Sequence, residues 1–385
     1  MMNSLIRRST FVGFVAAMLL CISPRLAFAQ KTKPPISPPP ITYQITFQAA
    51  STTLRSMNES GVAVGRTETA SGDRAIVRLA NGDILDLTNV AQLSEPNYVW
   101  SLLDYAIAIN ERGQIAGRGW RIEDGVPQAR LFRYSSNEGV LEAIRIFDPS
   151  RQIFVKGMND NGDVVLHASV NGQDTFPSLP GSGDSAWVFS GAPGQGVAVH
   201  LLDSAVPAAI NNFGTVAGAI NTGTRSLAFR YTPGQANPDL FGTINGNTST
   251  RYQVSDGLAI NELGTLAGWA CIGKTRTKEN TSERAVRLRS DGTWEDLQSS
   301  TANSWVTSIN YFGDTVGSGA ATGIGFIHYA GKLYSLRDLI VNPPANLKYV
   351  NPNVITDGGQ ICGGISIQNP DGTGSYSAVI LTPVP

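Results

Sequence analysis

A ten-residue pattern recurs seven times between residue 56 and the end of the chain, and it limits the possible folds more than any other feature. It reads small residue, Ile, Asn, two variable residues, Gly, any residue, apolar, small, Gly. Met twice replaces Ile, the third copy has Leu166 in place of the last Gly, and the last copy begins with Val and has Thr in place of Asn. The copies begin at Ser56, Ala108, Gly157, Ala209, Ala259, Ser308 and Val354. Their first glycines are 52, 49, 52, 50, 49 and 46 residues apart. A period near 50 residues is typical of propellers and related arrays.

Each copy predicts the same run of four short strands. The first strand ends at the Asn, whose side chain can bond the backbone two residues on and start a turn. The Gly that follows can take the left-handed conformation that a three-residue hairpin loop with a bulge requires. A second strand follows, then a loop of variable length, a third strand such as Ala228–Tyr231, a turn such as Asp291-Gly292, and a fourth strand. Four short antiparallel strands per unit make a propeller blade.

The two ends of the chain predict how the array closes. The last copy stops after its third strand, Ser377–Leu381, and lacks a fourth. Thr42–Gln48 precedes the first copy and alternates like a strand, so we expect it to complete the last blade. This pairing would leave no open sheet edge at the junction. An open β-solenoid, whose ends never meet, and two smaller β domains are the alternatives.

The favoured fold is therefore all-β: a single seven-bladed β-propeller of four-stranded antiparallel blades, closed by an N-terminal strand. It spans residues 42–385, with repeats near 42–90, 91–145, 146–202, 203–246, 247–299, 300–342 and 343–385. The Ala and Gly of the pattern suit the crowded inner part of a blade. A bulky residue in place of Ala217 or Ala267 should overpack it and cost about 1–3 kcal/mol.

Residues 1–29 read as an export signal. Arg7 and Arg8 form a positive start, Phe11–Ile22 is apolar, and Ala27-Phe28-Ala29 suits a signal peptidase, so we expect cleavage before Gln30. The apolar run is too short for a membrane anchor. Residues 30–41 hold five prolines and predict a stiff spacer. We expect a secreted or periplasmic, envelope-associated protein with no transmembrane span after cleavage, and the sequence leaves Sec and twin-arginine export open.

Composition argues against several classes of function. Removing three arginines with the signal leaves 26 of the 29 basic residues against 30 acidic residues, so no basic field for nucleic acid exists. The three histidines are scattered, and no hydrolase elbow, metal motif or phosphate-binding loop is present. We expect no cofactor, no bound metal and a monomer. Cys271 and Cys362 fall in blades that are not neighbours, so we expect no disulfide.

Ala209-Ile210-Asn211 followed by Leu227-Ala228-Phe229-Arg230-Tyr231 resembles the HAF family of extracellular repeats. The resemblance covers nearly all of residues 42–385. It departs from the family at Leu227, because no copy here has His before Ala-Phe. The family's Asp-Leu after the third strand is kept at Asp86, Asp239, Asp296 and Asp338. The resemblance implies an exported repeat protein and transfers no catalytic residue.

The variable loops predict the functional face. The Asn-x-x-Gly turns keep one length and lie on one side, whereas the loops on the other side vary, from Arg66–Asp73 to His167–Asp184 and Cys271–Glu283. A rigid scaffold with variable loops is the usual setting for binding. Aromatic residues of the loop side, which can stack on sugar rings or fill gaps between blades, are Tyr98, Trp100, Trp120, Phe176, Tyr252, Trp305 and Tyr349. Four basic residues of the same side have two interpretations: they form a patch that binds an anionic polysaccharide, or they are solvated strand ends. These residues are Arg66, Arg118, Arg121 and His167.

The favoured function is a non-enzymatic binding protein for a glycan or a protein at the cell envelope or outside. The alternative is a propeller enzyme acting on polysaccharide, either a lyase or a glycosidase. A glycosidase would need two carboxylates about 5–9.5 Å apart in a central pocket. An exposed aromatic surface on the loop side would favour binding instead.

Overall fold

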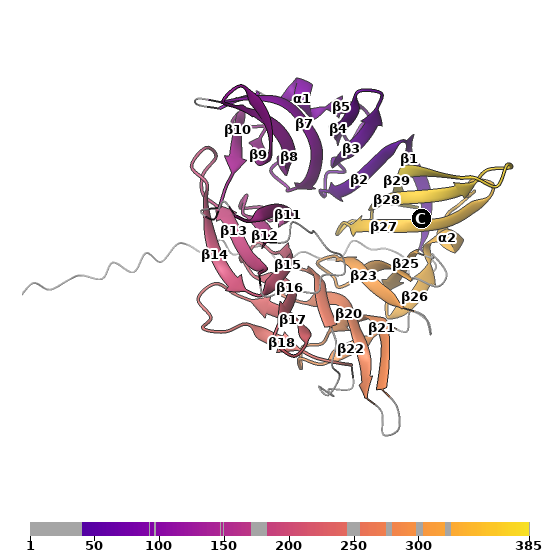
Figure 1. Ribbon diagram of the computed structural model, residues 1–385. Helices are drawn as coiled ribbons and strands as arrows, with labels where there is room; N and C mark the ends of the chain where they lie inside the picture. The colour runs from indigo at the N-terminus through magenta and orange to yellow at the C-terminus, as the bar shows by residue number, and fades with distance from the viewer. Residues whose placement is uncertain are drawn as a thin grey trace, which may run out of the picture. The chain divides into compact units, whose positions relative to one another are not determined.

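The computed structural model describes residues 41–384, apart from 92, 96–97, 147, 149, 171–182, 245–254, 275–278, 298–302 and 320–324. The predicted signal peptide and all but the last residue of the predicted spacer lie outside these residues. The described chain folds into seven antiparallel sheets arranged as a seven-bladed β-propeller (Figure 1). The predicted fold class is confirmed.

The strands of each blade are given from the innermost to the outermost. Blades 1 to 3 consist of β2 (Thr52–Met57), β3 (Ala63–Thr69), β4 (Gly72–Arg78) and β5 (Ile84–Asp86); β7 (Tyr98–Ile109), β8 (Gln114–Glu123), β9 (Val126–Ser135) and β10 (Val140–Ile144); and β11 (Gln152–Met158), β12 (Val164–Ser169), β13 (Ser185–Ser190) and β14 (Val197–Asp203). Blades 4 and 5 consist of β15 (Ala205–Ile210), β16 (Val216–Asn221), β17 (Ser226–Tyr231) and β18 (Asp239–Phe241); and β19 (Ser255–Ile260), β20 (Leu266–Lys274), β21 (Glu279–Leu288) and β22 (Trp294–Asp296). Blades 6 and 7 consist of β23 (Ser304–Ile309), β24 (Thr315–Gly319), β25 (Gly325–Tyr329) and β26 (Lys332–Ser335); and β27 (Leu347–Ile355), β28 (Ile361–Gln368), β29 (Gly374–Val384) and β1 (Thr42–Ala50). A two-residue strand, β6 (Ser94–Glu95), adds a fifth member to blade 2, and two single-turn helices, α1 (Leu87–Val90) and α2 (Leu336–Leu339), follow outer strands.

The repeated turn has the geometry that the sequence predicts. The seven glycines three residues after the Asn position all have positive φ, between 74° and 84°. In blade 4, for example, Oδ1 of Asn211 accepts hydrogen bonds from the backbone N–H groups of Phe213 and Thr215 at 3.1 and 3.0 Å. Asn therefore starts the turn, and Gly supplies the left-handed residue that ends it.

The same Asn also joins each blade to the next. Its Nδ2 donates to the backbone carbonyl of the Asn position in the following blade, at 3.0–3.3 Å. These bonds run from Asn58, Asn110, Asn159, Asn211, Asn261 and Asn310 to the carbonyls of Asn110, Asn159, Asn211, Asn261, Asn310 and Thr356. All six asparagines are buried. The repeated Asn thus links the blades as well as forming the turn.

The second Gly of the pattern lets the two inner strands of a blade come close. A Cβ on Gly218 would lie 2.2 Å from the carbonyl oxygen of Val206, and one on Gly317 would lie 2.1 Å from that of Trp305. The innermost strand carries a β-bulge at this level in every blade, including blade 3, which has Leu166 in place of the second Gly. In six blades the bulge nearest the Asn leaves one residue of the innermost strand without a partner in the neighbouring strand. These residues are Arg55, Ile107, Lys156, Ala208, Thr307 and Asn353.

The core consists of clusters between blades. Seven clusters of buried apolar side chains are found in the described part of the chain, one for each pair of neighbouring blades. Phe132 and Val64 pack between blades 1 and 2, and Cys362 and Leu54 pack between blades 7 and 1. This arrangement closes the ring and matches the expectation that a blade must be covered by its neighbours.

The ring is closed by the N-terminal strand, as predicted. β1 pairs antiparallel with β29, from Thr42 opposite Val384 to Ala50 opposite Ser377. Blade 7 lacks the Asn amide, because Thr356 holds that position. Its contact with blade 1 instead uses Nδ2 of Asn353, which donates to the carbonyl of Leu54 at 2.6 Å. The backbone N–H of Asp357 also donates to the Glu59 carboxylate, at 2.7 Å.

Two segments expected as loops are largely paired strand ends. Arg66 pairs with Ala75, and Glu68 pairs with Asp73, in the β3–β4 hairpin. Likewise β20 and β21 continue their pairing beyond Cys271. Sequence alternation fades near the ends of these hairpins, so the prediction ended the strands too early. Cys271 and Cys362 are free buried thiols, and burial raises the pKa of Cys362 to about 12.

Candidate functional site

Five of the candidate residues lie on the long inner strands of blade 2. β7 and β8 have 12 and 10 residues, and their loop-side parts carry Tyr98, Trp100, Arg118, Trp120 and Arg121. Because side chains alternate along a strand, Arg118 and Trp120 share one face of β8, whereas Arg121 points to the other. The two faces have different roles.

The face with Arg121 is buried. Arg121 is 1% exposed, forms ion pairs with Glu95 and Glu123, and stacks its guanidinium on Tyr98, 3.9 Å from the ring centroid. Hydrogen bonds from Arg130 and Arg121 lower the pKa of Glu123 to about 2. Trp100 is also buried, with its ring edge-on to Phe132. The structure therefore places Trp100 and Arg121 in the packing of the blade rather than at its surface.

The opposite face exposes Trp120 and Arg118. Both side chains are fixed by Asp104, a carboxylate of β7 that is itself buried. Asp104 accepts two hydrogen bonds from Arg118, at 2.8 and 3.2 Å, and one from the indole Nε1 of Trp120, at 3.1 Å. The hydrogen bond to Asp104 raises the pKa of Arg118 and is the largest influence on that pKa. Trp120 is 37% exposed and the Arg118 side chain 46%, so an aromatic ring and a guanidinium reach solvent side by side.

A second group of side chains gathers around Tyr105, the residue opposite Arg118 in the β7–β8 register. The guanidinium carbons of Arg66 and Arg55, both from blade 1, lie 5.2 and 5.6 Å from the Tyr105 ring centroid. Nε of Arg55 also donates to the Tyr105 hydroxyl. Arg66 forms an ion pair with Asp73. We call Arg55, Arg66, Tyr105 and Arg118 the arginine–tyrosine cluster.

The cluster extends toward blade 7 through Tyr376 of β29. Burial raises the pKa of Tyr376 and is the largest influence on it. The charge of Arg55 lowers this pKa, and the nearby Tyr105 raises it further. The Tyr376 ring is 40% exposed and crosses β28 at Gly364, where a Cβ would lie 2.0 Å from its hydroxyl. Tyr376 of blade 7 is therefore near enough to Arg55 of blade 1 and Tyr105 of blade 2 for their charges to influence its pKa.

The predicted basic patch forms only in part. Arg66 and Arg118 approach each other at Tyr105, whereas Arg121 is on the buried face of blade 2. His167 is 1% exposed in blade 3, where Nε2 lies 3.0 Å from Asp184 and the ring lies 5.7 Å from that of Phe154. Arg121 points to the opposite face of β8 from Arg118, and His167 is buried beside the Asp184 carboxylate. Neither side chain therefore joins the exposed arginines.

The other aromatic candidates do not join this group. Trp305 is half-buried on β23 of blade 6, and Tyr349 is half-buried on β27 of blade 7. Phe176 and Tyr252 lie outside the described residues. The sequence also did not single out Asp104, Tyr105, Arg55 or Tyr376. The sequence signal for this surface is the spacing of Arg118 and Trp120, which are two residues apart in a strand and therefore share one of its faces.

A buried titratable group lies in blade 5. Asp256, in the innermost strand of blade 5, is 2% exposed, and burial raises its pKa to about 7. The charge of Lys156, a bulge residue of blade 3, acts to lower that pKa.

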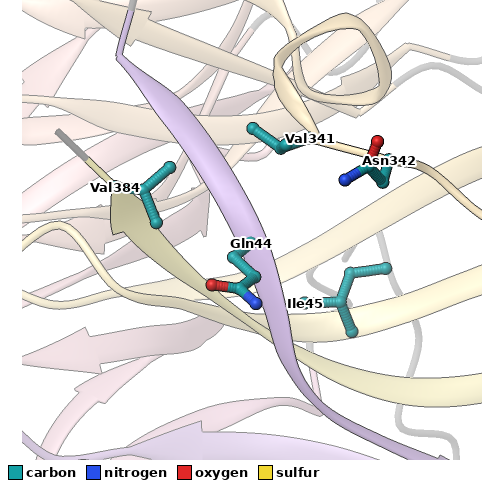
Figure 2. A pocket seen from close by; sticks show the side chains of 5 residues that line it. All are labelled: Gln44, Ile45, Val341, Asn342 and Val384. Carbon is teal, nitrogen blue, oxygen red and sulfur yellow. The ribbon is translucent and has the colours of Figure 1, made fainter.

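A separate pocket of about 410 Å³ lies at the ring closure. Figure 2 shows its lining by Gln44 and Ile45 of β1, Val384 of β29, and Val341 and Asn342 after α2. The backbone N–H of Val341 donates to the carbonyl of Tyr43 at 2.8 Å, which holds this segment against the edge of β1. The lining has no charged side chain, so the pocket offers no counterpart to the arginine–tyrosine cluster.

Within residues 41–384, less the gaps given above, no three His, Cys, Asp or Glu side chains are grouped so as to hold a metal ion. In the same part of the chain, no helix has the length and apolar character needed to cross a membrane.

No protein-family profile and no curated protein sequence matches the chain. Among solved structures, virginiamycin B lyase from Staphylococcus aureus is similar at 12% identity and a TM-score of 0.49, with 88% of this chain and 99% of that chain covered. Acylaminoacyl peptidase from Pyrococcus horikoshii is similar at 8% identity and a TM-score of 0.47, covering 84% and 52%. TolB from Acinetobacter baumannii is similar at 11% identity and a TM-score of 0.36, covering 87% and 64%. These values assign no function to this chain.

Proposed function

We propose that the protein is an exported, non-enzymatic glycan-binding protein of the HAF-repeat type, and that Trp120 and Arg118 form its sugar-binding surface. The observation that carries this proposal is the exposed indole of Trp120 beside the exposed guanidinium of Arg118, both held by buried Asp104. The apolar face of an indole can pack against the C–H face of a sugar ring, and the guanidinium can donate to ring hydroxyl or carboxylate oxygens.

Preorganisation strengthens this argument. An exposed Trp or Arg usually loses rotamer freedom on binding, at about 0.5–1.5 kcal/mol for each side chain. Here three hydrogen bonds to one carboxylate fix both side chains before a ligand arrives. Asp104 is itself the β7 residue at the pairing irregularity between Leu103 and Tyr105, with both of these neighbours paired to β8. The pair is therefore a ready surface on a rigid strand rather than on a flexible loop.

The alternative, an enzyme acting on polysaccharide, takes Asp256 as its candidate acid–base group. Asp256 is a buried carboxyl of the innermost strand of blade 5, and burial raises its pKa to about 7. Reducing-end and unsaturated-product assays on a polysaccharide panel test it, with Asp256→Asn as the control. Product formation that the substitution abolishes would establish the enzyme; no product from any polysaccharide removes it.

A glycan array probed with the purified protein tests the binding proposal. Trp120→Ala should abolish the signal for the bound sugars, because the stacking face is lost. Phe213→Ala is the matched control, because Phe213 is 59% exposed but belongs to an Asn-x-x-Gly turn on the opposite side of the ring. Binding that survives Trp120→Ala, or that Phe213→Ala removes, contradicts the assignment.

Export is tested separately. N-terminal sequencing of the protein recovered outside the cytoplasm should begin at Gln30. An uncleaved N-terminus, or retention in the cytoplasm, contradicts the proposed signal peptide without bearing on the sugar-binding surface.

A further inference from the structure

We infer that the arginine–tyrosine cluster is a second subsite, specific for the carboxylates of an acidic oligosaccharide. The inference rests on the proposed glycan-binding function and names the ligand class: a chain of uronic acid sugars. In this arrangement one sugar stacks on Trp120, and the acidic groups of the following sugars contact Arg118, Arg55 and Arg66.

The first argument is the concentration of positive charge. Arg55 and Arg66 both lie within 5.6 Å of the Tyr105 ring centroid, so their guanidinium carbons are at most about 11 Å apart. Arg118 is opposite Tyr105 in the same sheet. Only Asp73 and Asp104 form ion pairs with these three arginines among the described residues. Three arginines against two carboxylates leave the cluster with a net positive charge, which attracts an anion.

The second argument is unused hydrogen-bonding capacity. Arg55 is exposed, and no described carboxylate forms an ion pair with it. Arginine presents its N–H donors in a planar fork that matches a carboxylate. The cluster therefore retains donors of the type that bind a carboxylate in pairs.

The third argument is the path between the two subsites. Arg118 and Trp120 are two residues apart on β8, so their Cα atoms are separated by about 7 Å along the strand. From Arg118 the path continues to Tyr105 in the neighbouring strand, to Arg55 and Arg66 of blade 1, and toward Tyr376 of blade 7. Exposed aromatic rings thus stand at both ends of a cationic stretch, which suits an elongated ligand carrying repeated acidic groups.

The test compares an oligogalacturonate hexamer with its fully methyl-esterified form, in which each carboxylate is replaced by an uncharged ester. Isothermal titration calorimetry on the full-length mature protein at 50 mM NaCl should show at least about tenfold tighter binding of the acid. The difference should shrink to less than about threefold at 500 mM NaCl, because salt screens exposed charges. This measurement on the unaltered protein needs no variant to fold.

Variants then locate the effect. Arg55→Gln and Arg66→Gln should each weaken binding of the acid about fivefold to tenfold and leave the methyl ester unchanged. Arg112→Gln is the matched control, because it removes an exposed arginine from the Asn-x-x-Gly turn of blade 2, on the opposite side. Arg66→Lys keeps the charge and should recover part of the acid affinity.

The outcomes separate this inference from the proposed function. Trp120-dependent binding of sugars with equal affinity for acid and ester overturns the acidic subsite and leaves the glycan-binding proposal standing. Acid binding that depends on Arg55 and Arg66 but not on Trp120 supports the subsite and overturns the stacking surface. Failure to bind any sugar, on the array or in solution, overturns both.

Discussion

Asn211→Asp tests whether the repeated Asn is chosen for its second function, the link between blades. Asp would keep the acceptor oxygen that receives the N–H groups of Phe213 and Thr215. It would lose the Nδ2 donor to the carbonyl of Asn261, a bond of 3.1 Å at a residue that is 2% exposed. The turn is thus preserved while the bond between blades 4 and 5 is removed.

The magnitude follows from burial. Loss of one intramolecular hydrogen bond costs about 0.5–1.5 kcal/mol, and leaving a charged oxygen buried against a carbonyl adds a further penalty of about 1–3 kcal/mol. We expect a loss of about 3 kcal/mol in the free energy of unfolding at pH 7. For a chain of this size that corresponds to a fall in Tm of about 6 °C, at roughly 2 °C per kcal/mol.

Urea unfolding at several pH values provides the assay. Folding should raise the pKa of the introduced carboxyl, because only its protonated form can donate to the Asn261 carbonyl. A group with a raised folded-state pKa gives its stability at low pH and loses it as pH rises, so the defect should be smaller at pH 4.5 than at pH 7. A variant as stable as the unaltered protein at pH 7, or a defect that grows on acidification, would refute the reasoning.

Three further predictions concern the ring. Thr356→Asn supplies the missing blade 7 donor and should raise the free energy of unfolding by about 1 kcal/mol in urea titration; no change or a loss argues against the link. Gly218→Ala should be destabilising by several kcal/mol, since its Cβ would meet a backbone carbonyl at 2.2 Å, whereas Gly157→Ala, with its nearest neighbour at 3.6 Å, should cost less than about 1 kcal/mol; equal melting temperatures would contradict this. Burial raises the pKa of Asp256 to about 7, so its stabilising contribution is present below about pH 4 and is lost as pH rises through 7. Asp256→Asn should therefore flatten the decline in stability between pH 4 and 8, and an unchanged slope would exclude this carboxyl as its source.

The fold could be predicted because its determinants repeat. The spacing of Asn and Gly fixes the turn in each blade, and the missing fourth strand of the last repeat identifies Thr42–Gln48 as its replacement. The link between blades was not predicted, although its signal was present. Asp would start the turn equally well, so six asparagines in seven copies indicated that the amide donor mattered.

The candidate site could be predicted only in part. Strand parity places Arg118 and Trp120 on one face and Arg121 on the other, and applying it along β8 would have excluded Arg121 from the patch. The positions of Asp104 and Tyr105 could not be read in this way, because β7 has three pairing irregularities between Trp100 and Ala108. Each irregularity shifts which residues share a face, and the sequence does not show where they occur.

The most direct test of the account is a crystal structure of the protein with an oligogalacturonate bound. The account predicts a sugar ring stacked on the Trp120 indole, with a carboxylate of the ligand within hydrogen-bonding distance of the Arg118 guanidinium. Ligand found instead on the Asn-x-x-Gly side, beside Asp256 of blade 5, or in the pocket at Gln44 and Asn342 would contradict it.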